Sequence, residues 1–181
     1  MLPDILTPDL MVVIVGTSAA TVSANRGHYY AGPGNQFWTL LATSGLIGHR
    51  RLGPDDDQTL PGCGVGLTDL VKTRASSSDA NLVRNDYDVS GLVAKITHVS
   101  PRIVAFNGLT AAGVAGRALR HGKPPLGLAP WTIGTSAVFV LPSSSAAACD
   151  PAIWAPHTTK AHWWLELGEL ARMCGEGDGH D

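Results

Sequence analysis

The stretch from Val12 to Trp38 constrains the fold more than any other part of the chain. An apolar run at 11–15 predicts a buried strand. A long polar loop of small residues, Gly16 to Gly34, follows, and Asn35 then stands where it would cap a helix. The stretch therefore predicts a strand, a loop and a helix. In an open α/β sheet such a loop lies at the carboxyl edge, where ligands bind, and long loops are usually functional.

Apolar runs further along the chain predict more elements of the same kind. Buried strands are expected at 103–106 and 137–141, and a short apolar segment interrupted by polar residues lies at 65–71. Strands separated by helices favour a parallel sheet with helices on both faces, and strand-end loops gathered around one cleft. The expected helices are 35–44, 89–98, 110–120 and 159–173, the expected loops are 45–64 and 122–130, and 72–86 is expected to be mobile.

Composition indicates a soluble globular domain. The chain has 181 residues, of which 44% are hydrophobic and 15% charged, and no apolar run approaches the length of a membrane span. The first residues lack the features of a signal peptide. The three cysteines have no metal-ligand spacing, so we expect free thiols in a reducing cytosol.

The formal net charge of −2 argues mildly against a nucleic-acid-binding protein. The acidic residues are concentrated, however, with three at 55–57 and three between Glu176 and Asp181. The remainder of the chain is net basic, which leaves room for a local basic face.

Residues 26–38 match a known motif closely. They read RGHYYAGPGNQFW, and the strand before them is followed by Gly16-Thr17-Ser18-Ala19-Ala20. The segment resembles the first motif of the mismatch-specific uracil/thymine DNA glycosylases, within the uracil-DNA glycosylase superfamily. In that family the strand is followed by Gly-Ile-Asn-Pro-Gly and then by Lys/Arg-Gly-His-x-Tyr-x-Gly-Pro-Gly-Asn-x-Phe-Trp. The family's catalytic Asn falls on Ser18, and its Pro-Gly falls on Ala19-Ala20.

Two further segments resemble motifs of this family, in the family order. Residues 141–149 read LPSSSAAAC and resemble Met-Pro-Ser-Ser-Ser-Ala-Arg-Cys, the loop that enters the DNA helix and fills the gap left by an extruded nucleotide. A plain turn after a strand would also explain the serines. Residues 66–71 read GLTDLV and resemble Gly-Phe/Ile-Thr-x-Leu/Met-Val. The resemblance makes the insertion loop Ser143, Ser144, Ser145, Ala146 and Ala147, with Ala147 at the position of the family's intercalating Arg.

Asp69, at the variable position of the third motif, is the predicted catalytic carboxylate. A negative charge beside the sugar stabilises the oxocarbenium-like state of glycosidic cleavage, and the same carboxylate could orient or deprotonate the attacking water. A helix cap, or a surface ion pair with Lys72 or Arg74, would explain an Asp here equally well. Ser18 is a poor base at neutral pH, and no His, Lys or Glu adjoins it. We therefore interpret Ser18 as a residue that positions water or lines the pocket.

The resemblance also implies a base pocket. Its residues would be Gly16, Thr17, Ala19, Ala20, Tyr30 and Asn35. The ring of Tyr30 would stack on the flipped pyrimidine, and the backbone N–H groups of 17–20 would receive a pyrimidine carbonyl. Alternatively, Tyr30 plugs the edge of the core and Asn35 serves only as a helix cap.

Three basic residues are candidates for phosphate contacts. They are Arg26, Lys72 and Arg74, each of which could equally be a solvated surface residue. No phosphate-binding glycine loop, zinc spacing or iron–sulfur cysteine set is present, so no cofactor and no metal are expected.

The resemblance extends from about Leu2 to Met173 and implies a fold and a function. The fold would be one domain over 1–174, a three-layer α/β/α sandwich with a central, mostly parallel sheet, with a disordered tail at 175–181. The function would be that of a monofunctional DNA glycosylase in base excision repair. We expect a cytoplasmic monomer that acts on double-stranded DNA containing uracil or a mismatched pyrimidine, preferentially opposite guanine.

Two other functions fit the same residues. With Ser18 in place of Asn and Ala147 in place of Arg, the protein could bind mismatches or abasic sites without cleaving them. It could also be an α/β protein that binds a small nucleotide in the same cleft. The orientation of Asp69, toward the cleft or toward solvent, discriminates the enzyme from the lesion-binding protein.

Overall fold

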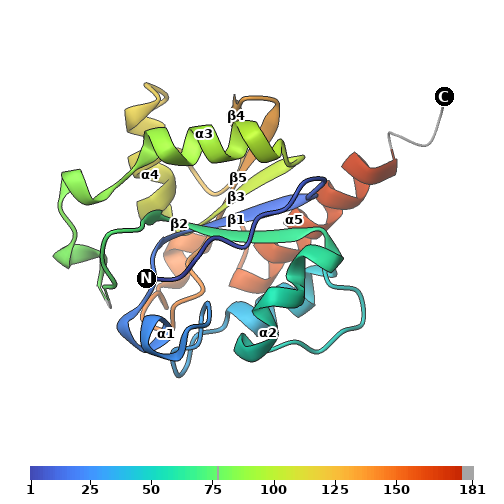
Figure 1. The fold of residues 1–181 in the computed structure, drawn as a ribbon. Helices are drawn as coiled ribbons and strands as arrows, with labels where there is room; N and C mark the ends of the chain where they lie inside the picture. Colours follow the sequence, from blue (N-terminus) through green and yellow to red (C-terminus); the bar gives the residue numbers. More distant parts are fainter. Residues whose placement is uncertain (77, 177–181) are drawn as a thin grey trace.

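A five-stranded sheet forms the centre of the molecule (Figure 1). The computed structural model describes residues 1–76 and 78–176. The strand order is β2-β1-β3-β5-β4, with β4 antiparallel to β5 and the other neighbours parallel, so the predicted mostly parallel sheet is confirmed. The strands are β1 Val12–Ser18, β2 Val65–Val71, β3 Ile103–Asn107, β4 Gly127–Ile133 and β5 Ser136–Leu141.

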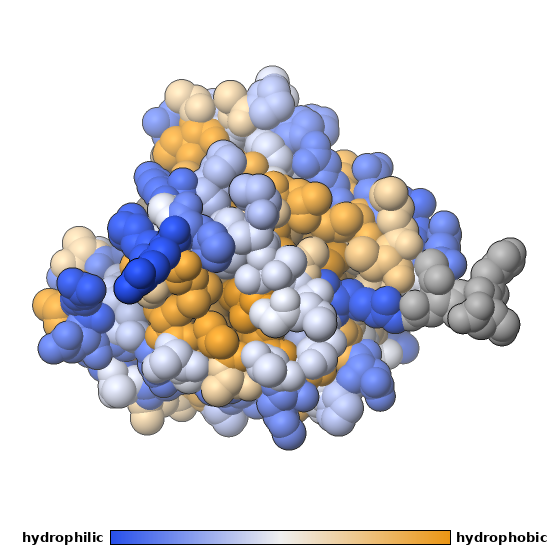
Figure 2. All heavy atoms as spheres, turned by 90° about the horizontal axis from the view of Figure 1, so that it is seen from above, coloured by the Kyte–Doolittle hydropathy of each residue, from blue (hydrophilic) through white to orange (hydrophobic). Residues whose placement is uncertain are grey.

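Helices cover both faces of this sheet, which confirms the three-layer arrangement (Figure 1). On one face lie α2 (Phe37–Ser44) and α5 (Lys160–Glu176), and on the other lie α3 (Val89–Val99) and α4 (Leu109–Ala118). Figure 2 views the molecule from the side of α3 and α4. In the described part of the chain, no helix combines the length and apolarity needed to cross a membrane. The shorter helices are α1 Thr21–Arg26 and four 3₁₀ segments, Pro54–Cys63, Asp79–Asn81, Arg84–Asp86 and Pro151–Trp154.

Alternation along β1 divides the core into two layers. The side chains of Val12 and Ile14 pack under α2 and α5, whereas Val13 and Val15 pack under α3 and α4. All four are completely buried, as expected for a central parallel strand covered on both faces.

A glycine allows α2 and α5 to pack closely. A Cβ atom at Gly168 would lie 1.8 Å from the carbonyl oxygen of Ser44, the last residue of α2. The backbones of the two helices therefore meet at this point, and only glycine leaves room for the contact.

Two loop predictions were wrong. The expected loop 122–130 contains the start of β4, an edge strand whose residues alternate between buried and exposed despite Gly127 and Pro130. The long loop after β1 contains α1, and β1 itself continues to Ser18. The described part of the segment 72–86 includes two 3₁₀ turns, the first capped by the hydroxyl of Ser78, and the mobility expected there stays a prediction.

The boundaries at two predicted ends also differ from expectation. The side-chain oxygen of Asn35 accepts a hydrogen bond from the Phe37 N–H at 2.9 Å, but the residue at the cap position of α2 is Gln36. Helix α5 runs to Glu176, past the predicted domain end at 174. The rest of the predicted tail, 177–181, lies outside the described residues.

We expect Gly168→Ala to destabilise the protein, because the added methyl group forces α2 and α5 apart. Overpacking of this kind costs typically about 1–3 kcal/mol in the free energy of unfolding. Urea denaturation would measure it. Gly175→Ala is the matched control in α5, since its Cβ would meet only the Met11 side chain at an ordinary 3.4 Å. Equal stability of the two variants would contradict the close contact.

Candidate functional site

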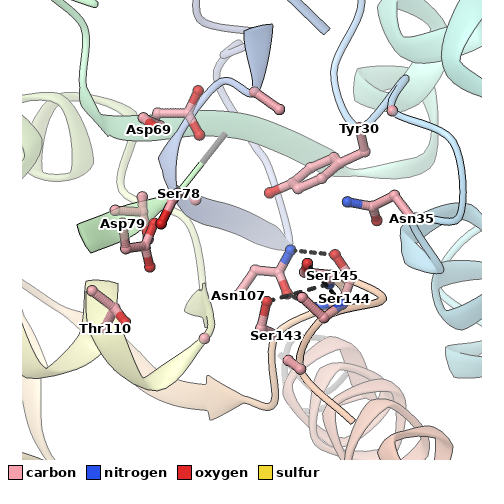
Figure 3. Close-up of a pocket in the computed structure, with 18 of the residues that line it drawn as sticks. Tyr30, Asn35, Asp69, Ser78, Asp79, Asn107, Thr110, Ser143, Ser144 and Ser145 are labelled. Carbon is pink, nitrogen blue, oxygen red and sulfur yellow. Dashed lines mark hydrogen bonds between the residues drawn. The ribbon is translucent and has the colours of Figure 1, made fainter. Parts of the chain in front are cut away.

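The carboxyl ends of β1, β2, β3 and β5 surround a cleft of about 510 Å³. Its walls come from four parts of the chain: the end of β1 with the loop after it, residues 76 and 78–80, the turn from β3 into α4, and the serine loop after β5 (Figure 3). The cleft lies where the sequence placed it, at the edge where ligands bind in open α/β sheets.

Asp69 lies in the wall of this cleft and is only 5% exposed. Its position on β2 is in register with Gly16 on β1, and both face the α2 and α5 side of the sheet. Burial raises the pKa of Asp69 to about 6, with Lys72 opposing the shift and Asp4 adding to it. The carboxylate is therefore a buried group that titrates close to neutral pH, which is a frequent property of catalytic acids and bases.

Gly16 makes room for this carboxylate. A Cβ atom at Gly16 would lie 2.3 Å from Oδ1 of Asp69 and 3.2 Å from the hydroxyl oxygen of Tyr30. Any side chain at position 16 would displace the carboxylate. The two polar groups thus converge on the bare backbone of one residue at the floor of the cleft.

Tyr30 presents its hydroxyl group to the cleft and its ring to the core. The ring stacks on Phe37 with a centroid distance of 3.8 Å and an interplanar angle of 11°. The hydroxyl oxygen is buried and has no hydrogen-bond partner among the described residues. Burial raises the pKa of Tyr30, the nearby Asp69 raises it further, and the neighbouring Asn107 side chain opposes the shift, so the phenol remains protonated and can act as a donor.

The residues at the end of β1 have structural partners. Ser18 donates its hydroxyl proton to the carbonyl of Ser76 at 3.4 Å, and Thr17 donates to Asp79 at 3.4 Å. The carbonyl of Ala19 accepts the N–H of Ser76. These contacts attach the 76–80 segment to β1. Thr17, Ser18, Ala19 and Ala20 all line the cleft.

Three anchors hold the serine loop. Asn107, at the end of β3, donates to the Ser144 hydroxyl and accepts the Ser144 N–H, each at 2.9 Å. The Gln36 N–H donates to the Ser144 carbonyl, and Lys160 donates to the Ser145 carbonyl at 2.8 Å. The loop backbone is therefore fixed by the end of β3 and by the starts of α2 and α5, all on the α2 and α5 side of the sheet.

The tip of this loop carries small, exposed side chains. Ala146 and Ala147 are exposed, and Ala147 lines the cleft together with Ser143, Ser144 and Ser145. Asn35, whose chain neighbour Gln36 bonds to the Ser144 carbonyl, lines the cleft beside this loop (Figure 3).

The candidate phosphate-contact residues have protein partners. Lys72 contacts Asp4 at 2.6 Å and donates to the Tyr29 hydroxyl at 2.7 Å, which argues against a phosphate contact by Lys72. The two arginines have side chains that are about half exposed. Arg26 pairs with Asp55 at 3.3 Å, and Arg74 donates to the Asn81 carbonyl at 2.8 Å.

Sequence reasoning missed the roles of three residues in and behind the cleft. Asn107–Gly108 was expected at the cleft as a strand end, but the part of Asn107 in holding the serine loop was not predicted. Asp79 lines the mouth of the cleft, and Lys160 supports the serine loop from behind, 6% exposed and with its pKa lowered by burial. No sequence pattern marks Lys160, because its role depends on how α5 packs against the loop.

Within the described residues, no group of three or more His, Cys, Asp or Glu side chains has the arrangement of a metal site. The chemistry of the cleft is that of a carboxylate, hydroxyl groups, amides and backbone dipoles.

Fold and cleft together define an α/β protein with a carboxylate site at the strand ends, and comparison with known families agrees. The family model of the uracil DNA glycosylase superfamily matches residues 3–168, so the chain belongs to this superfamily. Membership supports DNA glycosylase activity, with DNA as the substrate. Among solved structures, the solution NMR structure of a Methanosarcina acetivorans protein assigned as a uracil DNA glycosylase has a TM-score of 0.61 and 26% sequence identity. That similarity covers 93% of this chain and 96% of the other.

We expect Asn107→Ala to loosen the serine loop, because it removes both hydrogen bonds to the buried Ser144. Leaving buried polar groups unpaired costs about 1–3 kcal/mol of stability. Hydrogen exchange at the Ser144 amide would accelerate. Exchange of the amides in the central strands would change less, because they open only when the whole domain unfolds. Asn25→Ala, on exposed α1, is the control. Unchanged exchange at Ser144 would show that the other two anchors suffice.

Asp69→Asn should stabilise the protein at high pH. Since burial raises the folded-state pKa from 3.8 to about 6, the ionised carboxylate destabilises the fold above pH 6. The shift corresponds to about 2–3 kcal/mol. The free energy of unfolding of Asp69→Asn minus that of wild type should therefore be largest at pH 8. It should decrease by about 2–3 kcal/mol as the pH falls to about 4. Urea denaturation across this range, with exposed Glu169→Gln as control, would test it. A pH-independent difference would contradict the raised pKa.

Proposed function

We propose that the protein is a monofunctional DNA glycosylase that extrudes uracil or a mismatched pyrimidine, most readily opposite guanine, and hydrolyses its N-glycosidic bond. The observation that carries the proposal is the buried Asp69 carboxylate in the cleft, which lies against Gly16 beside the space that the Tyr30 hydroxyl also faces. Extruding a base requires less energy at a mismatch than at a normal pair, which provides part of the selectivity.

Asp69 acts in two stages of the reaction. As the bond between C1′ and the base nitrogen breaks, its electron pair leaves with the base and positive charge develops on the sugar. The Asp69 carboxylate stabilises that charge, with increased strength because the site is buried. Water then attacks C1′ and transfers a proton to Asp69. The products are an abasic site and the free base.

The opposite wall of the cleft receives the base. Among the described residues the buried Tyr30 hydroxyl makes no hydrogen bond of good geometry, so a pyrimidine carbonyl would satisfy it. A hydrogen bond there also stabilises negative charge on the departing base. The second donor is the side-chain amide of Asn35, whose oxygen is already used by the Phe37 N–H. Because Phe37 covers one face of the Tyr30 ring, we assign the tyrosine to base recognition through its hydroxyl group.

The anchored serine loop is the element that enters the duplex. Its exposed tip, Ala146 and Ala147, is small, so it would fill the gap left by the extruded nucleotide only in part. Such a loop favours substrates whose base pair is already weak. This agrees with a mismatch as the substrate.

One observation favours a second function, recognition of a mismatch or abasic site without cleavage. Position 18 carries a serine whose hydroxyl is directed to the Ser76 carbonyl rather than to the Asp69 side chain. If Asp69 does not take over the role of the family's catalytic Asn, whose position Ser18 occupies, the protein would bind the lesion without hydrolysing the glycosidic bond.

Single-turnover cleavage of labelled duplexes containing G·U, G·T and A·U pairs, and of single-stranded uracil DNA, tests both functions. We expect Asp69→Asn to lower the rate at least about 100-fold and Ser18→Ala to lower it less than about 10-fold. The wild-type rate should fall as the pH drops through about 6, because protonation removes the charge of Asp69.

Two results would count against the enzyme. Equal rates for Asp69→Asn and wild type would remove Asp69 from the mechanism. Retained binding to the mismatched duplex with no cleavage of any substrate would identify the lesion-binding protein instead.

A further inference from the structure

A second cavity opens on the α3 and α4 side of the molecule. It has a volume of about 730 Å³ and lies between the start of α3, the turn before it and the outer face of α4. Volumes of about 300–1,000 Å³ are typical of small-ligand sites. We call it the α3–α4 groove, and its lining includes Arg84, Tyr87, Val89, Thr110, Val114 and Arg117.

The α3–α4 groove adjoins the cleft. Thr110, in the first turn of α4, lines both cavities. Val114 and Arg117 follow on the same face of the helix, so Arg117 lies about 10 Å further along the axis at 1.5 Å per residue. A stacked nucleic-acid strand advances about 3.4 Å per nucleotide, so the groove matches the length of about three nucleotides.

The two arginines carry charge without a partner. Both are exposed, and among the described residues neither guanidinium has an ion pair with a carboxylate. The acids beside the groove are engaged elsewhere. Asp86 accepts the Val83 N–H and contacts Arg74, and Asp88 accepts the Gly91 N–H at the start of α3. Arg84 and Arg117 are therefore free to bind phosphates.

The floor of the groove is apolar. Val89 and Val114 line it, and the Tyr87 ring, partly buried against the same core layer, adds an aromatic surface. Figure 2 shows hydrophobic areas flanked by hydrophilic residues on this side of the molecule. A duplex would offer only its phosphates to such a groove. An unpaired strand would offer phosphates to the arginines and bases to the floor, which is how single strands are generally bound.

We propose that the α3–α4 groove binds unpaired nucleotides of the same DNA strand that places its extruded nucleotide in the cleft. The substrate class is then extended to uracil in single-stranded or locally melted DNA. This inference rests on the proposed function for the cleft, but the groove itself can be tested separately by binding.

The test compares Arg84→Gln/Arg117→Gln with wild type on two substrates, a fully paired G·U duplex and a bubble of several unpaired nucleotides around the same uracil. We expect the variant to bind the bubble at least about 10-fold more weakly, with the slope of log K against log salt reduced by about 1.4, since each of the two single-strand phosphate contacts contributes about 0.7. Cleavage of the G·U duplex should change less than about 2-fold. Arg51→Gln/Arg172→Gln removes the same charge from exposed positions outside the groove and serves as the control.

A direct probe of the floor uses 2-aminopurine placed two or three nucleotides from uracil, on either side, in a single strand. Stacking on Tyr87 should quench its fluorescence in wild type and in Tyr87→Phe, and less in Tyr87→Leu. Equal bubble binding by the two double variants would overturn the proposal. Loss of bubble binding in Arg84→Gln/Arg117→Gln, with no cleavage of any substrate by wild type, would support the groove as a DNA-binding site and reject the proposed enzyme activity.

Discussion

The contact between the Asp69 carboxylate and the backbone of Gly16 determines how the cleft is built. It places a negative charge in a layer that is otherwise apolar, against two strands whose register is fixed by the parallel ladder. Burying a carboxylate is unfavourable. Within the described residues, no hydrogen bond to the Asp69 carboxylate offsets this cost. Such a group persists only when the surrounding fold is stable enough to tolerate it. The two core layers and the close α2–α5 contact provide that stability.

The cleft combines two kinds of construction. Its floor is rigid, because Gly16, Asp69 and Asn107 belong to strands, and the Tyr30 ring is held against Phe37. Its rim consists of loops, and these loops are attached to the floor by specific hydrogen bonds. A catalytic group on a strand is positioned more exactly than one on a loop, whereas a loop can adapt to the irregular surface of DNA. A rigid floor and an adaptable rim would suit the proposed reaction, in which the base is held in place while the duplex is deformed.

Much of the fold could be predicted from the sequence because β1, β3 and β5 are continuous apolar runs and α3 shows clear helical spacing. β4 could not, since an edge strand with Gly127 and Pro130 resembles a loop until a neighbour pairs with it. In the cleft, the placement of Asp69, Tyr30 and the serine loop followed from motifs at strand ends. The anchoring roles of Asn107 and Lys160 did not, because they depend on contacts across 37 and 15 residues of chain. The internal partners of Lys72 were likewise invisible, because one of them, Asp4, lies at the far end of the sequence.

The way the serine loop is held has a consequence for how such a protein could diversify. Its three anchors use the backbone of Ser144 and Ser145 and the Ser144 hydroxyl, while Ala146 and Ala147 take no part in them. Substitutions at the tip would therefore leave the anchoring hydrogen bonds of the loop intact. Descendants of this chain could acquire a longer or charged wedge there through a single codon change, without rebuilding the cleft. If the proposed function holds, the residues that contact the duplex and those that act on the base could therefore change independently.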